Sequence, residues 1–168
     1  MSLNKNDEWY TPSDIISRVR EVMGDIDVDP ASCDQAQETV QAAEYYTKET
    51  DGLDFEWQGR VWCNPPYSKV LLNKFTKAFA EQYEAGIITE GIILTNSGTD
   101  TKWNQNVAPY LQAYTLGRIS FNTPGGEPAG KGGRGQVFTY VGNNPYKFIE
   151  VFTRDNFCWI PNLRYFLT

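Results

Sequence analysis

Apolar positions along the chain repeat with two periods, one typical of amphipathic helices and one typical of buried strands. Between a Thr-Pro pair and Gly24, apolar residues recur at helical intervals, which predicts a helix over residues 12–23. We expect Thr11 to cap this helix, with Pro12 at its first position and Asp14 closing a capping box. Similar patterns predict further helices over 31–44, from Ser68 to Gly86, from Thr99 or Asp100, and from Asn144.

Short apolar runs between these helices predict strands. They lie at 26–29, 60–63, 91–95, about 113–120, 136–141, and within 156–167. Strands that alternate with helices favour a mostly parallel central sheet with helices on both faces. The late strand pair flanks a Gly-rich loop at 122–135 and predicts an antiparallel edge hairpin. The pattern therefore indicates one doubly wound α/β domain over residues 1–168.

Composition narrows the possible chemistry. The chain has no histidine, which excludes every mechanism that needs an imidazole base. Its three cysteines form no C-x-x-C pair, so we expect no metal site. No apolar run approaches the roughly 20 residues of a membrane span, and the polar N-terminus does not resemble a signal peptide. We therefore expect a soluble, cytoplasmic protein.

The net charge of −6 is unusual for a protein that binds nucleic acid. Phosphate contacts usually come from a basic surface, and this chain has no long Lys/Arg run. If nucleic acid is the substrate, the positive groups must be local, and binding must be modest and salt-sensitive.

The most informative motif is Asn64-Pro65-Pro66-Tyr67, between a predicted strand and a predicted helix. The prolines stiffen the backbone and remove two N–H donors. Asn64 then offers a side-chain carbonyl and Pro65 a main-chain carbonyl, a rigid pair of acceptors for a planar NH₂ group. Accepting both amine protons concentrates the nitrogen lone pair and stabilises the charge that develops there. Tyr67 adds a ring on which a base can stack. The alternative is a proline-rich turn with a structural asparagine.

The chain resembles the phage-type DNA N6-adenine methyltransferases. The matching segments occur in the family's order and cover about residues 8–141. They are Glu8 to Pro12, Asp27 to Ser32, Tyr45 to Thr47, Asp51 to Leu53, Trp57, Cys63 to Ser68, Thr99 to Trp103, and Gly117 to Phe121. The resemblance implies a Rossmann-like methyltransferase fold, S-adenosylmethionine as the methyl donor and DNA as the partner. It also implies a phage or prophage origin, and hence the cytoplasm of a bacterial host.

The resemblance also assigns roles to individual residues. The reactive residues would be Asn64, Pro65, Pro66 and Tyr67. The donor-binding residues would be Thr11, Pro12, Asp29, Pro30, Ala31, Asp51, Leu53 and Asn64. The DNA-contacting residues would be Tyr67, Lys102, Phe121, Lys131 and Arg134. Some have plainer interpretations: helix capping for Thr11, Pro12 and Asp29, a turn for Asp51, and the core for Phe121.

Two departures from the general methyltransferase pattern leave alternatives open. Asp29-Pro30-Ala31 stands where a glycine-rich donor loop is usual, and we identify no separate target-recognition domain. Sequence reading would then fall to loops, chiefly 122–135 with Lys131 and Arg134. A planar amine is also presented by cytosine N4, by adenine in RNA and by glutamine in proteins. A non-catalytic DNA- or partner-binding module on the same fold is a further alternative.

Overall fold

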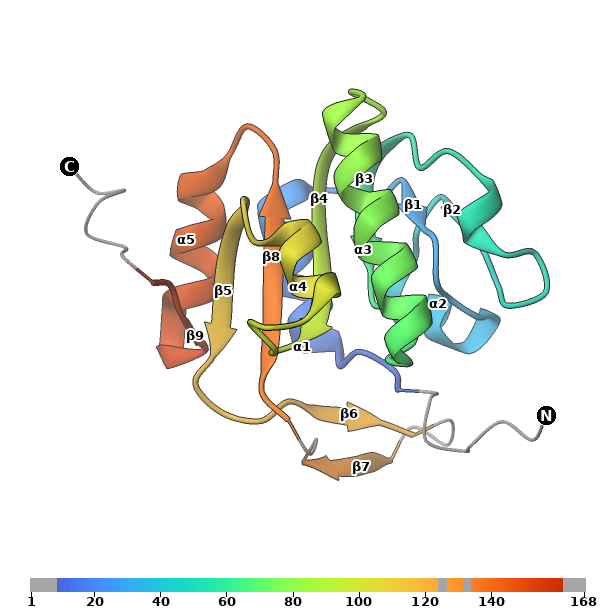
Figure 1. Cartoon of the computed structure of the whole chain (residues 1–168). Helices are drawn as coiled ribbons and strands as arrows, with labels where there is room; N and C mark the ends of the chain where they lie inside the picture. Colours follow the sequence, from blue (N-terminus) through green and yellow to red (C-terminus); the bar gives the residue numbers. More distant parts are fainter. Residues whose placement is uncertain (1–8, 124–126, 132–133, 162–168) are drawn as a thin grey trace.

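The computed structural model describes residues 9–123, 127–131 and 134–161, and these form a mixed α/β structure around a seven-stranded sheet (Figure 1). Its strands in spatial order are β2 (Glu44–Tyr45), β1 (Val28–Asp29), β3 (Gly59–Cys63), β4 (Ile88–Asn96), β8 (Gln136–Val141), β5 (Leu111–Thr115) and β9 (Cys158–Trp159). A separate antiparallel pair comprises β6 (Ser120–Asn122) and β7 (Pro128–Lys131).

The main sheet is mixed. β2, β1, β3 and β4 pair in parallel, whereas β8 is antiparallel to both β4 and β5, and β5 is antiparallel to β9. It follows that β5 runs in the same direction as β4, and only β8 and β9 run against the rest. The predicted parallel arrangement is therefore right for one half of the sheet and wrong for the other.

The predicted antiparallel pairing of the late strands is confirmed, because β8 pairs with β5, but their placement at the edge is wrong, because β8 lies inside the sheet between β4 and β5. All six residues of β8 are buried, as a strand covered on both faces requires. β4 and β5 are therefore not paired with each other, and β8, which comes later in the sequence, lies between them and is antiparallel to both. Proximity along the sequence suggested a simple hairpin, but the uninterrupted burial of residues 136–141 belongs to an interior strand.

Helices cover both faces of the sheet, as the sequence predicts. α1 (Ser13–Met23), α2 (Asp34–Val40) and α5 (Pro145–Thr153) share a core with Trp62, Ile92 and Leu94. α3 (Lys69–Glu84) shares the opposite core with Val61 and Ile93, and α4 (Lys102–Val107) packs there too. Successive strand residues thus face opposite cores. In Figure 1, α3 and α4 lie in front of the sheet.

The ends of the helices agree with prediction at some positions only. α1 begins at Ser13 with Pro12 as its N-cap residue and without a side-chain cap, so the predicted capping by Thr11 is wrong. Ser68 caps α3, as predicted, by accepting a hydrogen bond from the Leu71 amide. α4 starts slightly later than expected, and α2 covers only half of 31–44, because the chain turns there into β2.

The β6–β7 pair lies across the end of the main sheet at which β4 and β5 finish (Figure 1). It is joined to the start of the described chain by two backbone hydrogen bonds, 3.1 and 3.0 Å long, between Tyr10 and Asn122. This contact holds residues 9–12 beside the carboxyl ends of the parallel strands. Within the described ranges, no helix is long and apolar enough to cross a membrane.

Candidate active site

Polar side chains gather where neighbouring strands end. Asp29 is the last residue of β1, Asn64 directly follows β3, Asn96 ends β4, and Gln136 begins the antiparallel β8. Register places Cys63 opposite Ile93 and Asn96 opposite Gln136, so the alternation along each strand puts all four on the face that carries Trp62 and Leu94. Ligands of α/β sheets bind at this edge, which makes it the candidate site.

Asn64 is fixed by hydrogen bonds at both ends of its amide. Its Nδ2 donates to the Trp9 carbonyl oxygen at 3.3 Å and to Thr11 Oγ1 at 3.1 Å. Its Oδ1 accepts from the Tyr67 hydroxyl at 2.8 Å. Two acceptors on one side and a donor on the other define which way the amide faces. The buried Thr11 therefore acts on Asn64, and this role explains why its hydroxyl does not cap α1.

A chain of hydrogen bonds continues from Asn64 across the sheet. The Tyr67 hydroxyl lies 3.2 Å from Gln136 Oε1, and Gln136 Nε2 donates to Asn96 Oδ1 at 2.9 Å. Burial raises the pKa of the Tyr67 hydroxyl well above its usual value, so the phenol keeps its proton at neutral pH. The Asn64–Tyr67 loop is thus linked to β4 and β8 as well as to the N-terminal segment.

Aromatic rings pack behind this chain. Phe121 meets Tyr67 and Trp9 edge-on, with ring centroids 6.4 and 5.8 Å apart. Phe121 is only 2 % exposed and belongs to the core. The core interpretation of Phe121 is therefore confirmed, and the stacking of a target base on its ring stays a prediction. Tyr67 is half-buried, Pro65 is buried and Pro66 is half-buried.

Asp29 is a buried carboxylate without a positive partner among the described residues. It accepts hydrogen bonds from Gln37 Nε2 at 2.9 Å and from the Ala31 amide at 3.3 Å. Burial raises its pKa from 3.8 to about 7, and hydrogen bonds from Ser32, Ala31 and Gln37 oppose the rise. Burying an acid without a cation is costly, so the position suits a positively charged ligand.

The segment Asp51–Leu53 lies against the turn that follows Asp29. Gly52 is so close that a Cβ there would come within 2.0 Å of the Pro30 carbonyl oxygen. The buried Trp57 indole donates to the Gly52 carbonyl at 2.8 Å and fixes the turn. Asp51 Oδ1 accepts from the Leu53 amide at 3.1 Å, so the turn interpretation of Asp51 is confirmed. A role in binding the donor stays a prediction.

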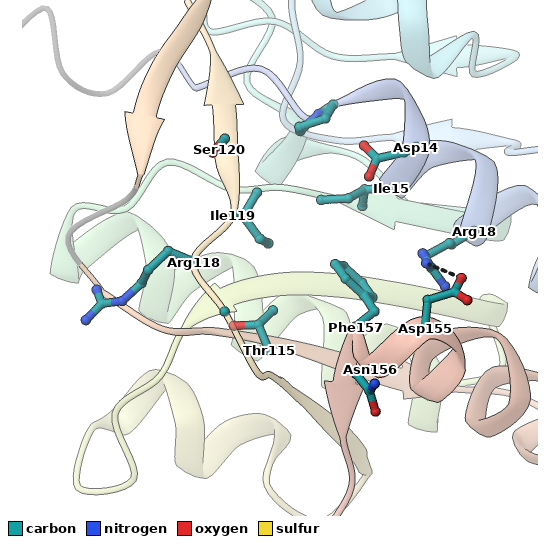
Figure 2. A pocket seen from close by; sticks show the side chains of 12 residues that line it. Asp14, Ile15, Arg18, Thr115, Arg118, Ile119, Ser120, Asp155, Asn156 and Phe157 are labelled. Atoms are coloured by element: carbon teal, nitrogen blue, oxygen red, sulfur yellow. Dashed lines mark hydrogen bonds and ion pairs between the residues drawn. The ribbon is translucent and has the colours of Figure 1, made fainter.

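Neither of the two surface pockets described below is lined by all the predicted donor-binding residues. Asp51 and Leu53 line a groove of about 320 Å³ against α3. A cavity of about 460 Å³ lies between the start of α1, the β5–β6 connection and the 3₁₀ turn Arg154–Asn156, and Figure 2 shows the residues that line it. Its wall includes Pro12 but neither Asn64 nor Asp29. Arg18 in this wall pairs with Asp155 at 3.4 Å.

The predicted DNA-contacting cations lie near the same edge. Lys102 begins α4, the helix that follows β4, and Arg134 lies two residues before β8; both side chains are exposed. Lys131 ends β7, and its side chain lies outside the described residues. Trp103 beside Lys102 is buried and donates to the Asn96 carbonyl, which confirms its place in the core. Within the described ranges, no cluster of three or more His, Cys, Asp or Glu side chains forms a possible metal site.

Sequence reasoning missed three members of the site, namely Gln37, Asn96 and Gln136. Gln136 carried a usable signal, because it is the polar first residue of a strand whose other members read as core. Gln37 is hydrogen-bonded to Asp29, eight residues away in the sequence, and Asn96 is hydrogen-bonded to Gln136, forty residues away. Neither partnership has a sequence spacing from which it could be read.

The structure thus defines a protein with a mixed α/β fold and a polar ligand site at the carboxyl edge of its parallel strands. Residues 2–157 match the DNA N-6-adenine-methyltransferase (Dam) family, and the chain belongs to that family. It is also similar to the DNA N-6-adenine-methyltransferase of Escherichia phage T1, with 31 % identity over 110 residues. That match covers 62 % of this chain and 44 % of the phage protein, so the chain spans under half of that relative's length.

Proposed function

We propose that this chain transfers a methyl group from S-adenosylmethionine to N6 of adenine in DNA, on a Rossmann-like methyltransferase fold. The observation that carries the proposal is the fixed Asn64 amide at the end of β3. Thr11 and the Trp9 carbonyl hold its nitrogen, so its oxygen faces Tyr67 and the site. Family membership and the similarity to the phage enzyme support the choice of adenine.

The residues beside Asn64 fit the proposed donor. When bound, S-adenosylmethionine supplies an electrophilic methyl group on a sulfonium. Asp29 offers a buried carboxylate for a cationic group such as the donor's ammonium, at a position that lacks a protein cation. Pro30, the next residue, is in close contact with the turn at Gly52. Asp51 and Leu53 are the proposed contacts of the donor's adenine.

At the acceptor, the chain orients a poor nucleophile. Asn64 Oδ1 and the Pro65 carbonyl would accept the two N6 protons, and the ring of Tyr67 would stack on the flipped base. Held in this way, N6 would be the nucleophile toward the sulfonium methyl group, and the electrons of the broken C–S bond would remain on the sulfur of the leaving thioether. The positive charge on N6 is stabilised by both carbonyls until one proton leaves to solvent. No covalent enzyme intermediate is required.

Positive side chains near this edge offset the acidic balance of the chain. Lys102 and Arg134 are exposed there, and Lys131 is the last residue of β7. With local phosphate contacts only, we expect modest and salt-sensitive DNA affinity.

The test is to incubate the protein with unmodified DNA and with S-adenosylmethionine that carries a deuterated methyl group. The DNA is then digested, and the nucleosides are analysed by mass spectrometry. We expect labelled N6-methyladenine. Asn64→Ala should reduce transfer by at least about a hundredfold while donor binding in a calorimeter persists. Asn106→Ala is the matched control, because Asn106 bonds Asn73 and Thr76 on the opposite face of the sheet.

Each competing function has its own outcome in this assay. Labelled N4-methylcytosine, methylated RNA or methylated glutamine in a peptide would replace the proposed substrate. An absence of donor binding by the unmodified chain would instead identify a non-catalytic module. Equal loss of donor binding and transfer in Asn64→Ala would contradict the role assigned to Asn64.

A further inference from the structure

Tyr67 has one hydroxyl proton and two carbonyl oxygens within reach. Asn64 Oδ1 lies 2.8 Å from the hydroxyl, and Gln136 Oε1 lies 3.2 Å from it. A phenol donates only one hydrogen bond, and the shorter distance places that bond on Asn64 in this structure. Gln136 is the second acceptor, within range of the same proton.

Gln136 is held firmly enough to keep this position. It is 4 % exposed, and its Nε2 donates to Asn96 Oδ1 at 2.9 Å. Its backbone amide donates to Thr115 Oγ1 at 3.2 Å, and its carbonyl accepts from the same hydroxyl at 3.3 Å. With its amide nitrogen bound to Asn96, the Oε1 atom remains directed at Tyr67.

The proposed reaction makes a demand on Asn64 that conflicts with the bond from Tyr67. Asn64 Oδ1 must accept a hydrogen bond from the target amine and stabilise the positive charge that develops on its nitrogen. A carbonyl that already accepts from a phenol is polarised toward that donor and serves a second donor less well. The oxygen is strongest as an acceptor for the amine when the phenol proton points elsewhere.

We propose that Gln136 is a positioning residue that takes over the Tyr67 hydroxyl bond when the target amine binds, and so leaves Asn64 Oδ1 to the amine. The exchange is a rotation of one O–H bond and breaks no covalent bond. This inference rests on the proposed function of Asn64. Gln136 does not touch the substrate; it acts through Tyr67.

The first variant is Gln136→Met, which keeps side-chain length and removes the acceptor. We expect kcat to fall about tenfold, the rate equivalent of one neutral hydrogen bond, with KM for DNA and donor affinity within about twofold of the original. Gln136→Glu retains a carbonyl oxygen for Tyr67, and when protonated it can also donate to Asn96. It should restore kcat to within about threefold.

The sheet offers a close control. Gln112 is also buried, accepts from the Tyr114 hydroxyl at 3.0 Å, and donates to Asn104 Oδ1 and Thr139 Oγ1 at 3.3 and 3.1 Å. Gln112→Met removes the same groups far from Asn64 along the sheet. It should lower stability to urea about as much as Gln136→Met does, with unchanged kcat.

A double-mutant cycle distinguishes positioning from a merely structural role. In a Tyr67→Phe background there is no hydroxyl to redirect, so Gln136→Met should have no further effect on kcat. If Gln136→Met fails to fold, Gln136→Thr, whose hydroxyl is too short to reach Tyr67, should show the same tenfold loss.

The outcomes separate this inference from the proposed function. If the unmodified chain methylates no adenine, the proposed function fails. If the unmodified chain methylates adenine but Gln136→Met keeps full kcat, the role of Gln136 is overturned and the proposed function stands. The same conclusion follows if Gln136→Met lowers kcat by the same factor in the Tyr67→Phe background as in the original protein.

Discussion

The buried carboxylate of Asp29 makes a prediction that links stability to donor binding. Replacing it by an amide, Asp29→Asn, removes the ionisable group while keeping the shape. Because the folded pKa is about 7 and the ordinary value is 3.8, the folded state holds a proton that the unfolded chain releases between these values. The contribution of Asp29 to stability is therefore highest below pH 4 and falls as pH rises toward 7.

The magnitude follows from the size of the shift. About three pKa units at about 1.4 kcal/mol each give at most about 4 kcal/mol of destabilisation above pH 7. Between pH 5 and pH 8 the original protein should lose about 2.5 kcal/mol that Asp29→Asn retains. The new amide group would face one of the donors that now bond the carboxylate, which costs about 1–3 kcal/mol at every pH.

The assay is urea unfolding of both proteins from pH 4.5 to 8, with and without S-adenosylmethionine. The stability of Asp29→Asn relative to the original should rise with pH and level off above 7. The donor at a hundred times its Kd should stabilise the original by about 2.7 kcal/mol and the variant hardly at all.

Asp27→Asn is the control for this pair. Arg60 lowers the pKa of Asp27, through an ion pair at 2.9 Å, so the stability that Asp27 contributes is lost only as pH falls below its usual pKa. This variant should lose stability by a constant amount across the same range. A pH-independent difference for Asp29→Asn as well would refute the raised pKa, and intact donor binding would refute the role in the site.

Three further predictions concern the turn, the N-terminal segment and DNA. Gly52→Ala places a Cβ against the Pro30 carbonyl, so we expect about 2 kcal/mol lower stability to urea and weaker donor binding by calorimetry. Unchanged stability and donor affinity would show that the turns at Pro30 and Gly52 can move apart at no cost. Thr11→Val removes an acceptor from Asn64 and should lower kcat several-fold, with Thr11→Ser near normal; equal rates for both would exclude the hydroxyl. Arg134→Gln should reduce the salt slope of DNA binding by about one, measured by anisotropy, and an unchanged slope would exclude a phosphate contact there.

The sequence was sufficient where a local rule governs the structure. The helical spacing that follows Ser68 predicted α3 and its cap, because both depend on residues within a few positions. The apolar strand before Asn64 likewise predicted where the Asn64–Tyr67 loop begins. These features set the class of fold and the centre of the candidate site.

Other features depend on contacts between distant segments, and there the sequence was insufficient. The insertion of β8 between β4 and β5 is decided by packing on both faces, which a nearby turn does not reveal. Thr11 was predicted to cap a helix because Thr-Pro commonly does so, yet its hydroxyl bonds Asn64, 53 residues away. The core position of Phe121 follows from rings contributed by Trp9 and Tyr67.

These long-range contacts explain how a common four-residue motif becomes a specific site. Thr11 comes from the segment that β6 holds in place, Asn64 and Tyr67 follow β3, and Gln136 begins β8. The orientation of Asn64 therefore depends on three separate parts of the chain being docked together. An unfolded or partly assembled chain would leave the amide free to rotate, and an amide that rotates presents its NH₂ group as readily as its oxygen. Positioning of the acceptor oxygen is thus a property of the completed sheet, because the motif alone contains no group that fixes Asn64 Nδ2.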